Sequence, residues 1–155
     1  METEMADEKV KSEALKFVKK KKLAVISTVS EKGAPEAATV LYFFDDDFNF
    51  FFVTRSDSRK AVNIAHNGNV AVVIGTELGP STMQMSGIAE QISSPEKQNE
   101  FIEKLTKDAV LQALYYGPFL SLMGVNFALY KVKITWARWL TLDLKGMREV
   151  YYQII

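Results

Sequence analysis

Hydroxyl and cationic side chains gather where a predicted strand ends and a predicted helix begins, in the run Thr54-Arg55-Ser56-Asp57-Ser58-Arg59-Lys60. Arg59 and Lys60 fall in the first helical turn, where the helix dipole disfavours each positive charge by a few tenths to about 1 kcal/mol. A bound phosphate would offset this, because hydroxyls, cations and free N–H groups would converge on one anion. Alternatively, Asp57 caps the helix and the basic side chains lie in solvent. The local pattern leaves both interpretations open.

Composition narrows the chemistry that the chain can perform. The 155 residues contain no cysteine and one histidine, His66, which removes thiolate nucleophiles, iron–sulfur clusters, cysteine or histidine-rich metal sites and most acid–base triads. Nineteen Lys and Arg balance nineteen Asp and Glu, so the broad positive field of a nucleic-acid-binding protein is missing. We therefore expect no nucleic-acid partner, and any phosphate ligand must be held by local groups.

Two segments bear on where the protein resides. The N-terminal residues METEMADEKV are acidic and polar and lack the basic and apolar regions of a signal peptide, so we expect a cytoplasmic protein. Residues 109–130 carry no charged side chain and are long enough for a membrane-spanning helix. Their composition favours a buried turn or lid followed by a strand, and no membrane partner, because polar and helix-breaking residues interrupt the segment at Gln112, Gly117, Pro118, Ser121, Gly124 and Asn126.

Hydrophobic periodicity predicts the elements that must position the Thr54–Lys60 run. An amphipathic helix is expected within residues 1–22, from the spacing of Val10, Ala14, Phe17 and Val18. Alternating and β-branched runs predict six strands, at 23–29, 37–44, 48–54, 70–74, 82–92 and 125–142. Short helices are predicted at 57–67 and from Ser94-Pro95 onward, and residues 143–155 are interpreted as a C-terminal tail.

Three local features of these strands lead to specific expectations. Asp45-Asp46-Asp47 predicts a polar hairpin tip in preference to a cation site, which needs about six oxygens. Gly87 interrupts a strand and predicts a bulge or a close backbone approach. The unbroken apolar run Val70–Ile74 predicts a central strand covered on both faces.

Hairpin-connected strands with short helices between them predict one domain over residues 1–155, mostly β with peripheral helices. The barrel and its inserted helices are expected at 23–142. One hairpin carries six phenylalanines, whose alternating directions cannot all lead into one barrel: Phe43, Phe44, Phe48, Phe50, Phe51 and Phe52. Some must meet another surface, from which we expect an obligate homodimer.

Five short motifs follow one another between about Leu23 and Ile92: Val40-Leu41-Tyr42-Phe43-Phe44, Phe50-Phe51-Phe52-Val53-Thr54, Ser58-Arg59-Lys60-Ala61, Asn67-Gly68-Asn69-Val70-Ala71-Val72 and Gly87-Ile88-Ala89-Glu90. In order and spacing they resemble the pyridoxamine 5'-phosphate oxidase-like family of FMN-binding split barrels. The resemblance implies a six-stranded antiparallel split β-barrel of the FMN-binding type. It also implies a homodimer that holds FMN in a cleft between two barrels.

The same resemblance assigns roles to individual residues. It implies that Ser58, Arg59 and Lys60 bind the FMN phosphate. It also implies that Val53 and Thr54 lie beside the flavin ring, and that Thr39, Val40 and Leu41 contact the ring mainly through their backbone. Thr82 stands where the oxidase has Gln and is included in the expected site. The chain departs from the oxidase at Ala38 and Phe43, where the oxidase has basic residues, and it lacks the Arg-x-His signature within Lys145–Ile155.

The implied function is that of an FMN-dependent oxidoreductase of unknown substrate, without pyridoxamine-phosphate oxidase activity. The scarcity of acid–base residues is compatible with this function, because a flavin supplies the redox chemistry itself. Two alternatives stay open: a non-enzymatic protein that holds FMN, a deazaflavin or haem in the same cleft, and a cofactor-free interaction barrel. The missing basic residues of the second strand favour the latter. The sequence assigns no catalytic residue and no metal ligand.

Overall fold

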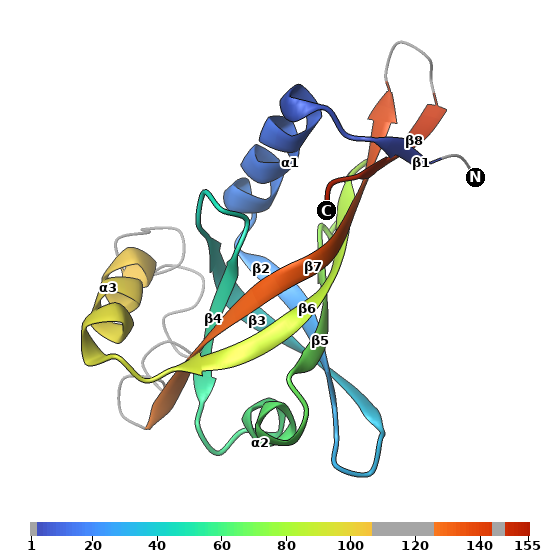
Figure 1. The fold of residues 1–155 in the computed structure, drawn as a ribbon. Coiled ribbons are helices and arrows are strands. Elements are labelled where there is room, and N and C mark those ends of the chain that lie inside the picture. Colours follow the sequence, from blue (N-terminus) through green and yellow to red (C-terminus); the bar gives the residue numbers. More distant parts are fainter. Residues whose placement is uncertain (1–2, 107–125, 144–147) are drawn as a thin grey trace.

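The computed structural model describes residues 3–106, 126–143 and 148–155. Its elements in chain order are β1 (Thr3–Met5), α1 (Glu8–Lys20), β2 (Leu23–Val29), β3 (Pro35–Phe44), β4 (Phe50–Arg55), α2 (Arg59–His66), β5 (Asn69–Ile74), β6 (Thr82–Ile92), α3 (Pro95–Thr106), β7 (Phe127–Asp143) and β8 (Arg148–Gln153) (Figure 1). Two of the predicted strands, 23–29 and 82–92, have the observed bounds, and the other four differ by one or two residues at one or both ends.

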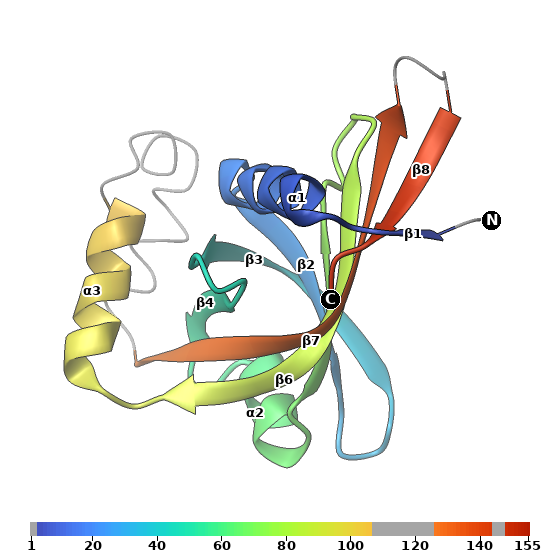
Figure 2. The same cartoon turned by 45° about the horizontal axis from the view of Figure 1, so that its top comes forward.

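Strands β2 to β7 form a closed antiparallel barrel. The order around it is β7-β4-β3-β2-β5-β6, and a further pairing of β6 with β7 closes it. Helix α1 lies near one end of this barrel and α2 near the other, while α3 lies against its side (Figures 1 and 2). The predicted six-stranded, mostly β barrel with peripheral helices is therefore confirmed.

Two short strands extend the sheet beyond the barrel. The end of β7 that passes beyond the barrel pairs antiparallel with β8, and β8 pairs in parallel with β1. No strand was expected at either terminus, and within the segment interpreted as a C-terminal tail Arg148–Gln153 form β8. Both strands are short, and they acquire a partner only because β7 is 17 residues long and leaves an edge to pair with.

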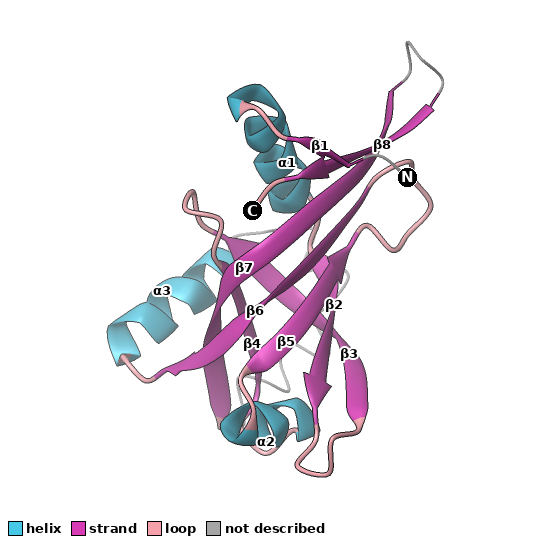
Figure 3. Cartoon of the chain, turned by 45° about the vertical axis from the view of Figure 1, so that its right-hand side comes forward, coloured by secondary structure: helices cyan, strands magenta, loops and turns pink. Residues whose placement is uncertain are grey.

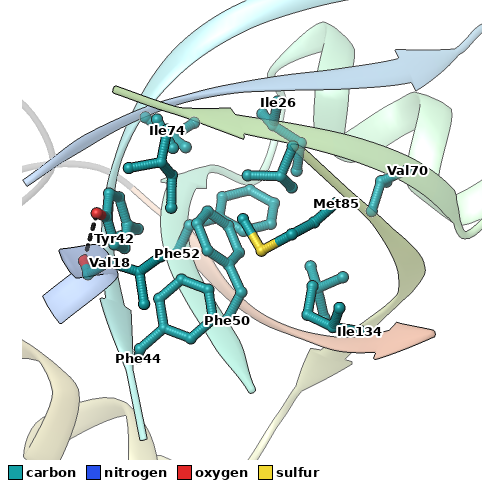
Figure 4. Packing of buried hydrophobic residues seen from close by; sticks show 14 of the residues in the cluster. Val18, Ile26, Tyr42, Phe44, Phe50, Phe52, Val70, Ile74, Met85 and Ile134 are labelled. Carbon is teal, nitrogen blue, oxygen red and sulfur yellow. Dashed lines mark hydrogen bonds between the residues drawn. The ribbon is translucent and has the colours of Figure 1, made fainter. Parts of the chain in front are cut away.

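The barrel interior is filled by aromatic and aliphatic side chains. Phe44, Phe50 and Phe52 lie at its centre with 0–1% of their surface exposed, among residues such as Ile26 and Ile74 (Figure 4). Helix α1 adds its buried Ala14 and Val18, as its amphipathic spacing predicts. The hydroxyl of Tyr42 donates a hydrogen bond to the carbonyl oxygen of Val18 at 2.5 Å (Figure 4), which ties the helix to β3.

The phenylalanines of the β3–β4 hairpin divide between two faces, as the alternation predicts. Phe43 and Phe51 lie outside the barrel, where they pack with Phe101 of α3 and with Leu129. The ring centroids of Phe43 and Phe101 are 6.3 Å apart. The second surface that this outer pair meets is thus a helix of the same chain, so the phenylalanines carry no argument for a second chain.

Strand β5 departs from its predicted burial. It pairs with β2 on one side and β6 on the other, but only alternate side chains, those of Val70, Val72 and Ile74, are buried, and Ala71 is exposed. The expectation of coverage on both faces is wrong, because a barrel strand has one face in the core and one face outside.

The other local expectations are confirmed. The Asp45 carboxylate accepts hydrogen bonds from the backbone N–H groups of Asp47 at 3.0 Å and Asn49 at 2.8 Å, which makes the hairpin tip a turn. The strand register shifts between Ser86 and Gly87, and a Cβ at Gly87 would lie 2.3 Å from the carbonyl oxygen of Lys133. Gly87 is therefore both a bulge and a close backbone approach.

Most of the uncharged segment 109–130 lies outside the described residues, so the expected turn or lid is not described, and β7 begins near its end. Within the described ranges, no helix has the length and apolar character needed to cross a membrane.

Candidate functional site

The start of α2 is set by Ser58. Its hydroxyl oxygen accepts a hydrogen bond from the backbone N–H of Ala61 at 3.3 Å, the geometry of a helix N-cap. Asp57, the cap in the alternative interpretation, instead pairs with Arg55 at 2.7 Å, and the hydrogen bond from Arg55 lowers the pKa of its carboxyl. The Asp57 interpretation is wrong because Ser58 directly precedes the first helical residue and its side chain reaches the third.

Three of the expected site residues form one chain of hydrogen bonds. The Lys60 Nζ donates to the Thr54 hydroxyl at 3.1 Å, and the Thr54 hydroxyl lies 3.1 Å from the hydroxyl oxygen of Ser58. Thr54 is buried at the end of β4, and burial lowers the pKa of the Lys60 ammonium. The end of the strand and the start of the helix thus bring an ammonium and two hydroxyls together.

Arg59 is paired with a residue that the sequence reasoning missed. Its side chain is 84% exposed, and its guanidinium donates to the carboxylate of Glu36, at the start of β3. The other carboxylate oxygen accepts from the Asn63 amide at 2.9 Å, and this amide also donates to the Thr28 hydroxyl at 2.9 Å. The hydrogen bond from Asn63 and the contact with Arg59 lower the pKa of Glu36.

A signal for this network existed in the sequence. Arg59 and Asn63 are four residues apart in a predicted helix, which places them on one helix face. Nothing local in the sequence shows that the start of β3 approaches that face. The role of the Glu36 carboxylate in this network can therefore be recognised only in the folded barrel.

These charged groups surround a cavity of about 270 Å³, which we call the anion pocket. Its lining residues are Ile26, Thr28, Glu36, Ala37, Ala38, Arg59 and Lys60. Its three charged side chains give it one net positive charge. An ammonium, a guanidinium and neighbouring hydroxyls are the donors that bind phosphate in proteins. The donor set therefore fits the phosphate of FMN.

The residues expected beside the flavin ring lie on two faces of the sheet. Val40 is 5% exposed and belongs to the barrel core, so its backbone alone remains for a ligand outside the barrel. Thr39 and Leu41 alternate with it and lie on the outer face. Leu41 packs in the outer cluster that contains Val53, which makes an apolar surface beside β3 and β4.

Thr82 is not brought together with the α2 residues in one chain. It begins β6 opposite Leu140 of β7, whereas the backbone beside α2 pairs with the other end of β6, where the Ala89 N–H donates to the Gly68 carbonyl oxygen at 2.8 Å. The loop before β6 and helix α2 lie at opposite ends of the barrel (Figure 3).

A second cavity, of about 290 Å³, lies between α3 and the outer face of the barrel. We call it the aromatic pocket. Its lining residues are Phe43, Asp45, Phe51, Ile92, Lys97, Glu100, Phe101, Lys104, Leu129 and Lys131. The Lys104 ammonium lies 4.5 Å from the centroid of the Phe43 ring and 2.8 Å from the Glu100 carboxylate. Lysines that are distant in sequence therefore share a pocket, which sequence reasoning did not find.

A closed six-stranded antiparallel barrel, with a cationic pocket at a short helix and a pocket of aromatic and charged side chains on its outer face, defines a protein of the split-barrel class. The family model described as pyridoxamine 5'-phosphate oxidase matches residues 10–140. The chain belongs to this family, and the resemblance drawn from the short motifs is confirmed.

Known proteins agree with this assignment. The chain is 32% identical over 79 residues to a pyridoxine/pyridoxamine 5'-phosphate oxidase of Vibrio cholerae, a match over 51% of this chain and 37% of that protein. A Clostridium acetobutylicum structure, described as related to general stress protein 26 of the pyridoxinephosphate oxidase family, has a TM-score of 0.67 at 17% identity and covers 96% of this chain and 97% of its own. A haem-binding protein from Mycobacterium smegmatis has a TM-score of 0.65 at 17% identity, over 92% and 57%. At such identities these two structures show the fold alone.

Proposed function

We propose that this chain is an FMN-binding flavoprotein that acts as a flavin-dependent oxidoreductase on a small molecule. The observation that carries the proposal is that Lys60, which is hydrogen-bonded to Thr54 and through it to Ser58, lines the anion pocket together with Arg59. The family resemblance assigns binding of the phosphate to Ser58, Arg59 and Lys60. Membership of the family supports the same ligand.

In this proposal the chain's own residues bind and orient the ligand. Lys60 donates to the phosphate, with Thr54 and Ser58 holding the ammonium in place. The apolar outer face at Leu41 and Val53 contacts the ring and excludes water from it. When bound, FMN supplies the redox chemistry itself.

The aromatic pocket is the proposed place of the substrate. Phe43 and Phe51 belong to the same outer cluster as Leu41 and Val53, so a ligand along the outer face of β3 and β4 would reach this pocket. Its lining combines five apolar side chains, three of them aromatic, with three lysines and two carboxylates. These features favour a planar or apolar molecule with a polar substituent.

We further propose that the protein is a homodimer. The residues that the family resemblance assigns to one FMN lie at opposite ends of one barrel, with Thr82 at one end and the α2 residues at the other. In a homodimer, Thr82 of a second chain would complete the site formed by the α2 residues of the first. Ile88 of β6 and Trp136 of β7 are 40% and 36% exposed on neighbouring strands, which supports an interface there. Sedimentation velocity at micromolar concentration tests this, and a clean monomer would contradict it.

The experiment that tests the ligand is an absorbance spectrum of the purified protein, with mass spectrometry of the compound that it releases on denaturation. We expect the bands of oxidised flavin and the mass of FMN. A haem or deazaflavin spectrum would overturn the proposal. A colourless protein that also fails to bind added FMN would favour the cofactor-free barrel.

A further inference from the structure

The anion pocket contains a carboxylate that opposes its proposed ligand. Glu36 lines the pocket together with Arg59 and Lys60. An anion in this pocket would lie beside the negative charge of Glu36, and like charges within a few ångströms of each other repel appreciably even near the protein surface. The Glu36–Arg59 ion pair compensates this charge while the pocket is without an anion.

The two partners of this pair differ in how firmly they are held. The Glu36 side chain is 23% exposed, and its carboxylate accepts a hydrogen bond from Asn63, which is itself 6% exposed and also bonded to Thr28. The Arg59 side chain is 84% exposed. Glu36 is therefore fixed between α2 and the barrel, and Arg59 is the partner that can move.

We propose that Glu36 is an internal counter-ion that sets the anion affinity of this pocket by competing with the ligand's phosphate for Arg59. The inference rests on the proposed function. While the pair is intact, Lys60 provides the net positive charge of the pocket. A phosphate gains the full attraction of Arg59 only by drawing the guanidinium away from Glu36.

The proposal predicts whether the removal of each charge raises or lowers the affinity for FMN. Glu36→Gln leaves an amide oxygen to accept from Asn63 and releases Arg59, so it should tighten FMN binding. Arg59→Ala removes the cation that pairs with the Glu36 carboxylate beside the phosphate, so it should weaken FMN binding. The double variant has the same net charge as the wild type and should restore most of the affinity that Arg59→Ala loses.

The test is a set of flavin fluorescence titrations with FMN and with riboflavin, which lacks the phosphate. Expected FMN affinities are about fivefold to tenfold tighter for E36Q, about tenfold or more weaker for R59A, and within about threefold of wild type for the double variant. Riboflavin affinity should stay unchanged in E36Q. The matched control is E77Q, which removes the carboxylate of an ion pair with Lys21 (2.6 Å) outside the pocket and should change neither affinity.

An FMN affinity that E36Q leaves unchanged or weakens overturns the inference, as does a double variant no better than R59A, while the proposed function stands in both cases. If the wild type and every variant fail to bind FMN, the proposed function falls and this inference falls with it.

Discussion

The two pockets use the same strand in different ways. Strand β3 begins at the anion pocket with Glu36 and ends at the aromatic pocket with Phe43. In the first pocket, the Glu36 carboxylate that pairs with Arg59 is hydrogen-bonded to the buried Asn63, whereas the second pocket forms where aromatic side chains pack α3 on the barrel. Specific hydrogen bonds thus define one pocket and packing defines the other, so different substitutions should disable them.

The largest effect is expected in the core beneath the aromatic pocket. Phe52 is fully buried and stacks on Tyr130 with ring centroids 5.2 Å apart, so Phe52→Ala should lower the free energy of unfolding by about 3–5 kcal/mol. Phe51, the preceding residue, lies half-buried on the outer face, and its replacement by Ala should lower the free energy of unfolding by about 1–2 kcal/mol. Urea unfolding measures both. Equal losses would show that the outer face is as fully packed as the core and would remove the distinction between them.

The next effect concerns the anion pocket alone. Replacing Arg59 and Lys60 together by Ala should weaken FMN binding about a hundredfold or more, because each charge-assisted hydrogen bond contributes roughly 1.5–3 kcal/mol. The matched control replaces Lys97 and Lys104 at the aromatic pocket and should change FMN affinity by less than about threefold. An unchanged dissociation constant in the Arg59/Lys60 variant, or an equal loss in the control, would show that the phosphate is not held at α2.

A smaller effect is expected on stability in acid. The pKa of Glu36 is lowered in the folded protein by its hydrogen bond from Asn63 and by Arg59. A depressed carboxyl pKa stabilises the fold above the pKa of the unfolded chain, and this contribution is lost as pH falls through the folded pKa. The wild type should therefore lose more stability than E36Q below about pH 4. Thermal unfolding from pH 7 to pH 3 measures this, and parallel curves for the two proteins would contradict it.

The smallest signal is expected for the oxidase reaction itself. The aromatic pocket presents Phe43 where the oxidase has a basic residue, and its lysines share the pocket with Asp45 and Glu100. We expect FMN-loaded protein to show no significant oxidation of pyridoxamine or pyridoxine phosphate with oxygen as acceptor. Turnover of about 1 s⁻¹ or above would show that the three lysines suffice to hold the second phosphate.

The predictable parts of the molecule are those with local signals. Period-two alternation located the barrel strands, and the run from Ser58 to Lys60 located the helix start that lies at the anion pocket. Gly87 marked the bulge because its missing side chain is required there by the nearby Lys133 carbonyl. In each case the feature depends on residues that are close in sequence.

The parts that escaped prediction depend on contacts between distant segments. Glu36 meets Arg59 across 23 residues, and Lys131 reaches the aromatic pocket from a strand that follows α3. Strand β8 forms because β7 extends beyond the barrel and offers an edge. Some of the six hairpin phenylalanines were expected to meet another surface, and for Phe43 and Phe51 this surface is α3, which no local pattern could show.

The most direct measurement of the central claim compares FMN with riboflavin. The two molecules share the flavin ring and differ by the phosphate, so the ratio of their dissociation constants reports what the anion pocket contributes. Isothermal titration of the wild-type protein should show FMN binding about a hundredfold or more tightly than riboflavin. Equal affinities, or no binding of either, would contradict the account of Ser58, Arg59 and Lys60 as a phosphate site.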